Sequence, residues 1–332
     1  MKRILIITRG PLVNFRQMPG GTNRTADGEY EFHLNTIDVR PDFVAVIGKG
    51  IRQPVTFDAD RRHTLLLTNE PHDIFEYPRN YCRQFGTVCS CQEEMHADNV
   101  LHTPAFLPWH IGYIPQSDGT VTFTKSYDDI ASAQPEKTKL ISVISSKKAL
   151  CRGHVDRLHF IDRLQQRYGD RIDVYGNGYN SFGDKWDVLA PYKYHIVIEN
   201  SSTDYYWTEK LGDCYLASAF PLYHGCTNID RYFPGDAYER IDIRNTDRTF
   251  ATIDRILASQ LYEERRAQLQ QAKQSVMDKY NFFNMLADVC RTITDADDGT
   301  RQLMKPARQM SSLHNVWLYT MGRNYYKLLS LL

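Results

Sequence analysis

The chain has 332 residues, and its 40 basic residues balance 40 acidic ones, so the formal net charge is zero. A balanced charge gives no long-range field that would draw the protein to nucleic acid, and we expect no nucleic-acid partner. The length exceeds that of one ordinary compact core and favours two domains.

Neither a signal peptide nor a membrane-spanning segment is predicted. The apolar run at residues 4–7 is too short for a leader, and no stretch approaches the roughly 20 apolar residues that span a bilayer. The seven cysteines are scattered and odd in number, which argues against a disulfide framework. Cys89-Ser90-Cys91 lacks the spacing of a zinc pair, so we expect buried reduced thiols. A soluble cytoplasmic protein is the expectation.

Short apolar runs alternate with polar segments in the first half of the chain. Residues 11–35 are polar and glycine-rich and are predicted as a long loop or a β-hairpin rather than core. Residues 115–138 contain two prolines without periodicity and are predicted as the linker between domains. Buried strands, which favour a parallel sheet covered by helices, are predicted at residues 3–8, 43–47, 64–68 and 85–90.

The same alternation restarts after the linker. Helices are predicted over residues 154–168 and 207–219, the first from its apolar stripe. Strands are predicted at residues 140–143, 172–175, 194–198 and 221–223. The fold class is therefore predicted as α/β, with two Rossmann-like domains facing each other across a cleft, the architecture called GT-B.

The last third of the chain is predicted to be helical. Residues 250–293 are highly charged, and residues 303–332 are basic and aromatic. The apolar spacing in the last segment predicts an amphipathic helix that packs back on the first domain, with contact to a membrane surface as the alternative. Its apolar residues are Val316, Leu318, Tyr319, Met321, Tyr325, Leu328 and Leu329.

A strand, a polar loop and a helix start follow one another from residue 194 to residue 219. The strand delivers Glu199 and Asn200 to its carboxyl end, and the helix begins near Thr208. Free N–H groups at a helix start suit a phosphate. Lys210 in that first turn is unfavourable to the helix dipole, which indicates that it binds an anion. The Glu209 carboxylate suits the hydroxyl groups of a ribose. An ordinary helix start with a surface Glu-Lys pair fits the pattern equally well.

Two further residues follow predicted strands. Arg157 lies early in the helix after the strand at 140–143, where its forked guanidinium suits a diphosphate; Arg152 and Arg163 are the alternatives. Glu70 lies in the segment Thr68-Asn69-Glu70-Pro71-His72, which directly follows the apolar run at residues 64–67. A carboxylate there suits a general base, with His72 as its rival. A loop Glu that caps the next turn is the plain structural reading.

No metal site is predicted. Asp58-Ala59-Asp60 lies in a charged turn, and Asp295-Ala296-Asp297 follows a helix, so neither Asp-x-Asp motif is placed at a strand end. Arg157 and Lys210 would offset phosphate charge in place of a divalent ion.

The stretch YKYHIVIENSSTDYYWTEKLGDCYLASAFPLYHGCTNIDRYFP, residues 192–234, resembles the signature region of the α-1,3/4-fucosyltransferases, glycosyltransferase family 10. The spacing from Asn200 through Tyr206 to Glu209-Lys210 carries the resemblance, which covers about residues 140–235. It resembles the soluble bacterial members of that family. The resemblance implies a GT-B fold and inverting transfer from GDP-β-L-fucose, with no essential metal or other cofactor.

Residue roles follow from the resemblance. It implies that Lys210 and Arg157 hold the diphosphate and that Glu209 binds ribose, with Glu70 as the catalytic base. The remaining expected donor residues are Glu199, Asn200 and Tyr206, and the expected acceptor residues are His72, Trp109 and His110. The expected domains are an acceptor domain at 1–134, a donor domain at 135–295 and a helical extension at 296–332.

The expected partners are a nucleotide-sugar donor and a glycan or glycolipid acceptor, as in protein glycosylation or lipopolysaccharide synthesis. Peripheral contact with the inner face of a membrane is a further expectation. Two alternatives stay open: transfer of another nucleotide-linked sugar, and an inactive nucleotide-binding or scaffold protein.

Overall fold

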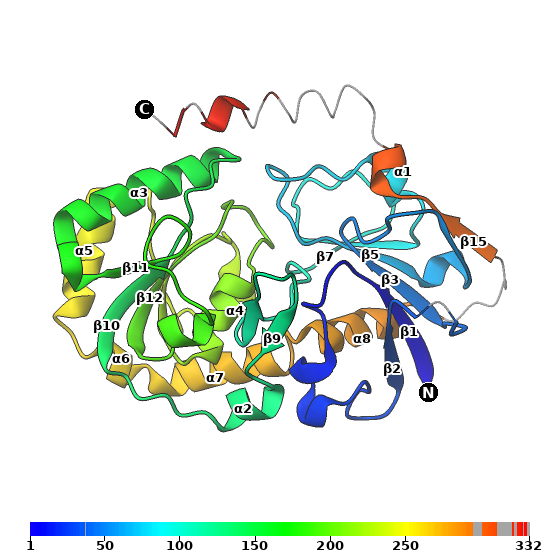
Figure 1. Cartoon of the computed structure of the whole chain (residues 1–332), viewed down its shortest axis with the longest axis horizontal. Coiled ribbons are helices and arrows are strands. Elements are labelled where there is room, and N and C mark those ends of the chain that lie inside the picture. Colours follow the sequence, from blue (N-terminus) through cyan, green and yellow to red (C-terminus); the bar gives the residue numbers. More distant parts are fainter. Residues whose placement is uncertain (37, 295–300, 311–320, 322–323, 328, 331–332) are drawn as a thin grey trace. The chain divides into compact units, whose positions relative to one another are not determined.

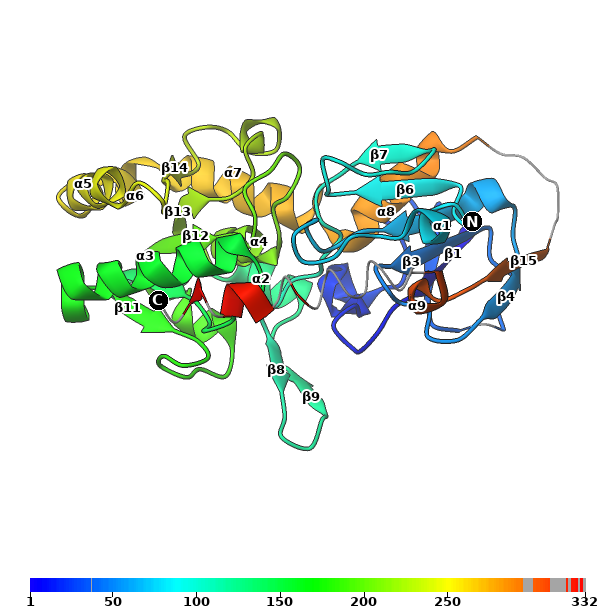
Figure 2. The same ribbon diagram turned by 90° about the horizontal axis from the view of Figure 1, so that it is seen from above.

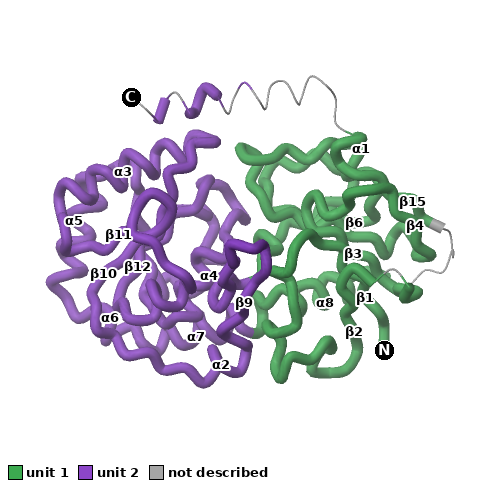
Figure 3. The backbone as a smooth tube through the Cα atoms, in the orientation of Figure 1, with its two compact units in different colours: residues 1–108, 278–319 green, residues 109–277, 320–332 purple. Residues whose placement is uncertain are grey.

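The chain forms two compact units in the computed structural model (Figure 3). The first contains residues 1–108 and 278–319, and the second contains residues 109–277 and 320–332. Each unit is built around a parallel sheet with helices, so the predicted α/β class and the two Rossmann-like domains of a GT-B protein are confirmed. The structure describes residues 1–36, 38–294, 301–310, 321, 324–327 and 329–330.

The first unit holds a six-stranded sheet in the order β2-β1-β3-β5-β6-β7, and every neighbouring pair is parallel (Figure 1). The strand order changes direction between β1 and β3, as in doubly wound folds, so helices cover both faces. The strands are β1 (Lys2–Ile7), β2 (Tyr30–Leu34), β3 (Phe43–Ile47), β5 (Thr64–Leu67), β6 (Thr87–Ser90) and β7 (Val100–His102).

Both faces of this sheet are apolar, because its inner strands are buried along their whole length. Helix α8 (Phe282–Thr292) brings the Phe283 ring within 5.1 Å of the Phe32 ring of β2. A second cluster joins Leu5, Val44 and Leu66 to the short helix α1 (Arg79–Cys82). The helix and the strands thus hold residues far apart in the sequence in one core.

A small antiparallel pair, β4 (Val55–Asp58) with β15 (Arg301–Met304), adds to the second cluster. Met304 is 1% exposed there and is followed by α9 (Ala307–Met310). The start of the C-terminal extension therefore packs on the first unit. Most of the predicted amphipathic helix lies outside the described residues. Within the described part of the chain, no helix has the length and apolarity needed to cross a membrane.

The second unit holds a five-stranded parallel sheet in the order β11-β10-β12-β13-β14. This order also reverses once, between β10 and β12, and the carboxyl ends of the strands at such a switch point form the usual ligand site of an open α/β sheet. The strands are β10 (Lys139–Ile144), β11 (Asp173–Tyr175), β12 (Tyr192–Ile198), β13 (Phe220–His224) and β14 (Glu239–Arg240).

Helix α3 (Arg152–Tyr168) connects β10 to β11, and α4 (Glu209–Leu216) connects β12 to β13. Since parallel crossovers are right-handed and these two run in opposite directions along the sheet, α3 and α4 cover opposite faces. Tyr168 of α3 donates a hydrogen bond to the Phe250 carbonyl at 3.1 Å. The remaining helices are α5 (Thr246–Leu257), α6 (Leu261–Glu264) and α7 (Arg266–Met277).

Two sequence-based expectations about loops were wrong. Residues 11–35 include β2, whose Tyr30 and Phe32 are buried, because alternation with polar neighbours gives that edge strand one core face. Residues 115–138 do not form an unstructured linker. They include most of a hairpin formed by β8 (Tyr113–Pro115) and β9 (Val121–Phe123), and Figure 2 shows this hairpin projecting from the second unit. A capping box on Ser126 then starts α2 (Tyr127–Ser132).

The unit boundaries also differ from the expected breaks after residues 134 and 295. Residues 109–134 join the second unit, where the backbone N–H of His110 bonds Asp213 at 3.0 Å. Helix α8 belongs to the first unit, because its aromatic residues pack on β2. Contacts between residues so far apart in the sequence leave no pattern in the local composition, so the composition could not predict these boundaries.

Candidate functional site

The strand β12 ends at the switch point of the second sheet and delivers Glu199 and Asn200 to its carboxyl end, as the sequence predicts. Glu199 is only 1% exposed. Its two carboxylate oxygens accept from the Thr208 N–H at 2.9 Å and from the Thr208 hydroxyl at 2.8 Å. The Glu199 carboxylate therefore anchors the start of α4 through hydrogen bonds within the protein.

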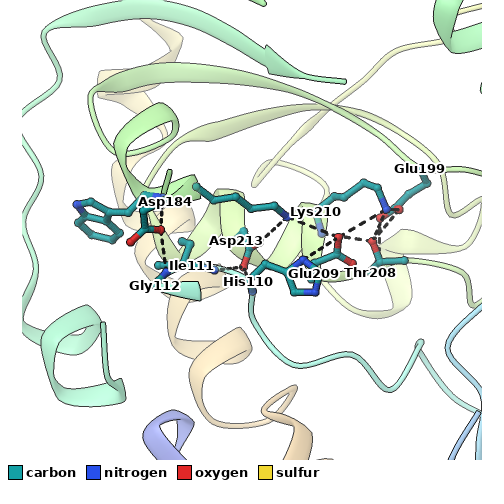
Figure 4. Close-up of polar contacts among 11 residues, drawn as sticks. His110, Ile111, Gly112, Asp184, Glu199, Thr208, Glu209, Lys210 and Asp213 are labelled. Carbon is teal, nitrogen blue, oxygen red and sulfur yellow. Dashed lines mark hydrogen bonds and ion pairs between the residues drawn. The ribbon is translucent and has the colours of Figure 1, made fainter. Parts of the chain in front are cut away.

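Thr208 is the N-cap of α4, and its hydroxyl oxygen accepts from the Lys210 N–H at 3.3 Å. The Lys210 ammonium lies 3.3 Å from Glu199 Oε2 and 3.8 Å from Glu209 Oε1 (Figure 4). Burial lowers the pKa of Lys210, but the two carboxylates outweigh that effect and raise it. Lys210 is thus a permanent cation in the first turn of a helix, with 28% of its side chain exposed.

Glu209 lies among three basic side chains. Its Oε1 is 3.5 Å from Lys185 Nζ and 3.7 Å from His110 Nδ1, besides the contact with Lys210. Burial raises the pKa of Glu209, but the positive charges of Lys210 and Lys185 outweigh it and leave the pKa below its ordinary value. The carboxylate is therefore ionised at neutral pH although only 9% of it is exposed.

Asp213 lies one helical turn after Glu209, on the same face of α4. It is 1% exposed, and its Oδ2 binds Lys185 Nζ at 2.8 Å. Its Oδ1 accepts from the His110 and Ile111 N–H groups at 3.0 and 3.4 Å. The segment before the hairpin is therefore fastened to α4, and Asp184 fastens the next residue by accepting from the Gly112 N–H at 2.8 Å (Figure 4).

Arg157 of α3 reaches the same edge of the sheet. It is 4% exposed, and its Nη1 donates to Asn200 Oδ1 at 3.0 Å. Its Nη2 donates to the Ser146 carbonyl at 3.3 Å, while its buried Nε has no hydrogen-bond partner among the described residues. Arg152 and Arg163 instead pair with Asp156 and Asp247, so the structure places only Arg157 of the three beside Asn200.

The loop between β12 and α4 is held from the loop that follows β13. Asn228 Oδ1 accepts from the Tyr205 N–H at 2.9 Å, and Tyr205 has a left-handed φ of 66°. Tyr206 is 1% exposed. Gly225 lies against Glu199, because an added β-carbon would meet Glu199 Cγ at 2.5 Å. A non-glycine residue in the left-handed region is unusual and marks a loop whose shape is imposed by its neighbours.

Trp109 and His110 lie in the second unit, although the sequence groups them with the acceptor domain. Trp109 is 3% exposed, and its ring stacks on Tyr127 at 6.2 Å. His110 faces Glu209, as described above, and burial lowers its pKa. Its Nε2 is buried without a hydrogen-bond partner in the described part of the chain.

Glu70 belongs to the first unit and follows β5, an interior strand of that sheet, as predicted. Its backbone carbonyl accepts from Gln92 Nε2 at 2.9 Å, and the same amide nitrogen donates to the Phe75 carbonyl at 2.7 Å. His72 is exposed and lines a pocket of about 430 Å³ in the same unit with Glu76, Arg79, Gln92, Glu94 and His96. The loop from Glu70 to Phe75 is thus fixed beside a polar pocket.

Asp58-Ala59-Asp60 is not arranged as a metal site in the described structure. Asp60 caps a 3₁₀ turn and binds the Arg62 guanidinium at 2.6 Å, and residues 295–297 lie outside the described residues. Among described residues, no group of three or more His, Cys, Asp or Glu is arranged to hold a metal ion. All seven cysteines are buried thiols.

The sequence placed the helix start at Thr208 without its contact to Glu199, and Asp213 and Lys185 were not predicted as members of this cluster. Thr208 had a readable signal, because a threonine before Glu-Lys is a favoured N-cap. Asp213 was also readable, since it lies four residues after Glu209 on the same helical face. Lys185 had none: it comes from a 3₁₀ turn before β12, and only the tertiary fold brings it to α4.

Residues 134–306, just over half of the chain, match the model described as glycosyltransferase family 10 (fucosyltransferase) C-term. Among solved structures, the chain is similar to a crystal structure of an α1,3-fucosyltransferase, with 16% identity and a TM-score of 0.47, over 96% of this chain and 88% of that one. A structure of α1,3-fucosyltransferase with GDP matches with 14% identity and a TM-score of 0.46, over 100% and 90% of the two chains. One with GDP-fucose matches with 15% identity and a TM-score of 0.41, over 96% and 89%.

Proposed function

This chain belongs to glycosyltransferase family 10, the fucosyltransferase family, and is a glycosyltransferase; from that premise we propose that it transfers L-fucose from GDP-fucose to a glycan hydroxyl with inversion. The acceptor is a glycan or glycolipid. The roles of individual residues that follow are part of the same proposal.

One observation carries the donor assignment. Lys210, a permanent cation, lies in the first turn of α4, and Arg157 of α3 lies at the same edge of the sheet. The helix start supplies N–H groups and a partial positive charge. A lysine there opposes the helix dipole, and Arg157 keeps a buried Nε without a described partner. Both costs are offset if a diphosphate binds between these groups, since charge-assisted hydrogen bonds are roughly twice as strong as neutral ones.

Glu209 is assigned to the ribose of the donor. Its carboxylate is ionised, and an ionised carboxylate accepts two hydrogen bonds from neighbouring hydroxyls. Asn200 orients Arg157, and Tyr206 closes the loop beside them. Glu199 acts through Thr208 and Lys210 and is a positioning residue in this scheme.

Glu70 is assigned as the general base. Its carboxylate takes the proton of the acceptor hydroxyl while that oxygen forms a bond to the anomeric carbon of fucose. The bond from this carbon to the phosphate oxygen breaks, and its electron pair leaves with GDP. Arg157, Lys210 and the N-terminus of α4 stabilise the charge that develops on the leaving group, without an essential metal in this proposal. A positioned base typically contributes about 10²–10⁴-fold to the rate.

The polar pocket lined by His72 is assigned to the acceptor, because it lies beside the loop that carries Glu70. The contact of His110 with Glu209 supports a donor-side role for His110 instead of the acceptor role expected from sequence.

A two-part experiment tests the function. Thermal shifts with GDP, UDP and CDP come first, and GDP should stabilise the protein most because a ligand that binds only the folded state raises its stability. Transfer from GDP-fucose to a glycan array is then compared between the wild type and Glu70→Gln, which should keep GDP binding and lose transfer. Preference for UDP or CDP would point to another sugar donor. GDP binding without transfer to any acceptor would favour an inactive nucleotide-binding protein.

A further inference from the structure

We propose that Lys185 and Asp213 are positioning residues that hold the Glu209 carboxylate for the ribose of the donor, so that the preference for a ribonucleotide depends on them. The inference rests on the donor site of the proposed function. It concerns two residues that lie outside the Thr-Glu-Lys segment.

Lys185 bridges two carboxylates of one helix face. Its ammonium lies 2.8 Å from Asp213 Oδ2 and 3.5 Å from Glu209 Oε1. Only 16% of the Lys185 side chain is exposed, against 9% for Glu209 and 1% for Asp213. A largely buried cation held at hydrogen-bond distance by one acid cannot swing freely, so it presents a fixed charge to the other.

Lys210 alone cannot keep Glu209 in place during the reaction. Its ammonium is shared between Glu199 at 3.3 Å and Glu209 at 3.8 Å. When that ammonium serves a diphosphate, its attraction for Glu209 weakens, and a partly buried carboxylate needs another partner. Lys185 is the cation that stays, because its 2.8 Å bond to Asp213 involves neither Lys210 nor Glu199.

His110 does not replace Lys185 in this role. Its Nδ1 lies 3.7 Å from Glu209 Oε1, which is beyond hydrogen-bond distance. Burial lowers the pKa of His110, so the ring is largely neutral at physiological pH. Its backbone N–H, however, bonds Asp213 at 3.0 Å and fixes the orientation of that carboxylate. Asp213 is therefore held from two sides and in turn orients Lys185.

The rival interpretation is that Lys185 is a third side chain that binds the diphosphate, besides Lys210 and Arg157. The two readings differ in the part of the nucleotide that senses a substitution. A residue that binds the diphosphate strengthens the binding of GDP and of its dideoxy analogue equally. A residue that acts through Glu209 strengthens only the binding of nucleotides that have ribose hydroxyls. Comparison of GDP with 2′,3′-dideoxy-GDP separates them.

Calorimetric affinities for GDP and 2′,3′-dideoxy-GDP are measured for the wild type, Lys185→Met and Asp213→Asn. Lys193→Met is the matched control, because Lys193 pairs with Glu263 on the surface of the same unit. A hydrogen bond to a charged group corresponds to a preference of roughly ten- to hundredfold, and we expect this for GDP in the wild type and the control. In both test variants the preference should fall to about threefold or less, while dideoxy-GDP binding changes little. Lys185→Arg should restore it in part.

Each outcome has one reading. Lys185→Met with the full preference for GDP overturns the inference, and an equal loss for both nucleotides assigns Lys185 to phosphate instead. A wild type that binds both nucleotides equally removes the ribose role of Glu209 from the proposed function itself. Circular dichroism establishes that each variant is folded, and if Lys185→Met is not, Lys185→Gln and Asp213→Asn supply the same comparison.

Discussion

Gly153 and Asn200 approach so closely that a methyl group on the Gly153 α-carbon would meet the Asn200 carbonyl oxygen at 2.1 Å. Gly153 is the second residue of α3, and Asn200 is the second residue after the end of β12. The contact sets how near α3 lies to the sheet edge, and therefore where Arg157 meets Asn200.

We expect Gly153→Ala to destabilise the second unit. Alanine inside a helix normally gains about 1 kcal/mol over glycine. Here the new β-carbon meets a backbone carbonyl that cannot rotate away, and overpacking of this kind costs roughly 1–3 kcal/mol. Denaturant unfolding measures the change, with Gly183→Ala as the control because nothing lies within 4 Å of its added β-carbon. Equal stability of the two variants would show that α3 can shift without cost.

Lys210→Ala should nearly abolish transfer and leave a folded protein. In the proposed mechanism the variant loses the cation that stabilises the leaving group, and removal of one such electrostatic contact costs roughly 10²–10³ in rate. Burial already raises the pKa of Glu199, so its carboxyl can take up a proton when its ionic partner is lost. Initial rates with GDP-fucose are compared with those of the surface variant Lys193→Ala. Turnover near that of the wild type would exclude Lys210 from the diphosphate site.

The start of α4 could be read from the sequence because its signals are local. The β-branched run of β12 and a threonine N-cap before Glu209 and Lys210 are all within 20 residues. The strand at 43–47 was likewise predicted with its observed bounds, since a continuous apolar run between turn residues has few other readings.

Lys185 and β15 could not be read in this way. Lys185 meets Asp213 across 28 residues, and β15 pairs with β4 across more than 240, so no local pattern encodes either contact. The edge strand β2 is an intermediate case. Its alternation of Tyr30 and Phe32 with polar residues is a strand signal, but the surrounding glycines and polar residues obscured it.

Two buried histidines should make the second unit sensitive to acid. Burial lowers the pKa of His154 to about 4 and that of His195 to about 3, against an ordinary value of 6.5. As pH falls below 6.5, the unfolded chain binds protons that the folded state does not, so stability is lost from pH 6.5 down to about pH 4 for His154 and about pH 3 for His195. Each histidine contributes a loss of about 2 kcal/mol between pH 7 and pH 5.

His195→Gln tests this directly, since glutamine can still bond Ser142, whose hydroxyl lies 2.8 Å from His195 Nδ1. The pH dependence of the unfolding free energy should become shallower by about one proton. His159→Gln, at an exposed position of α3, serves as the control. An unchanged slope for His195→Gln would mean that the ring is protonated in the folded state or that water reaches it.

Gln92→Glu should weaken catalysis through the loop that carries Glu70. The Gln92 amide is 3% exposed and donates to the Glu70 and Phe75 carbonyls, and an ionised glutamate of the same size cannot donate. Unpaired buried carbonyls cost roughly 1–3 kcal/mol. Because the loop loses its clamp, we expect kcat to fall about tenfold while GDP affinity stays unchanged. A loss of GDP affinity in place of kcat would contradict the placement of Glu70 as base.

Met304→Ala should destabilise the first unit far more than Leu303→Ala, although the residues are neighbours in β15. Met304 is 1% exposed within the core cluster, whereas Leu303 is 56% exposed. Truncation of a buried methionine typically costs about 2–5 kcal/mol, and that of an exposed residue within about 0.5 kcal/mol. Urea unfolding followed by far-ultraviolet circular dichroism measures the change in unfolding free energy for both variants. Since β15 follows residues 109–277 of the second unit in the chain, a large effect confined to Met304 would establish that the chain returns to complete the first core in solution. Equal small effects would mean that β15 contributes nothing to that core.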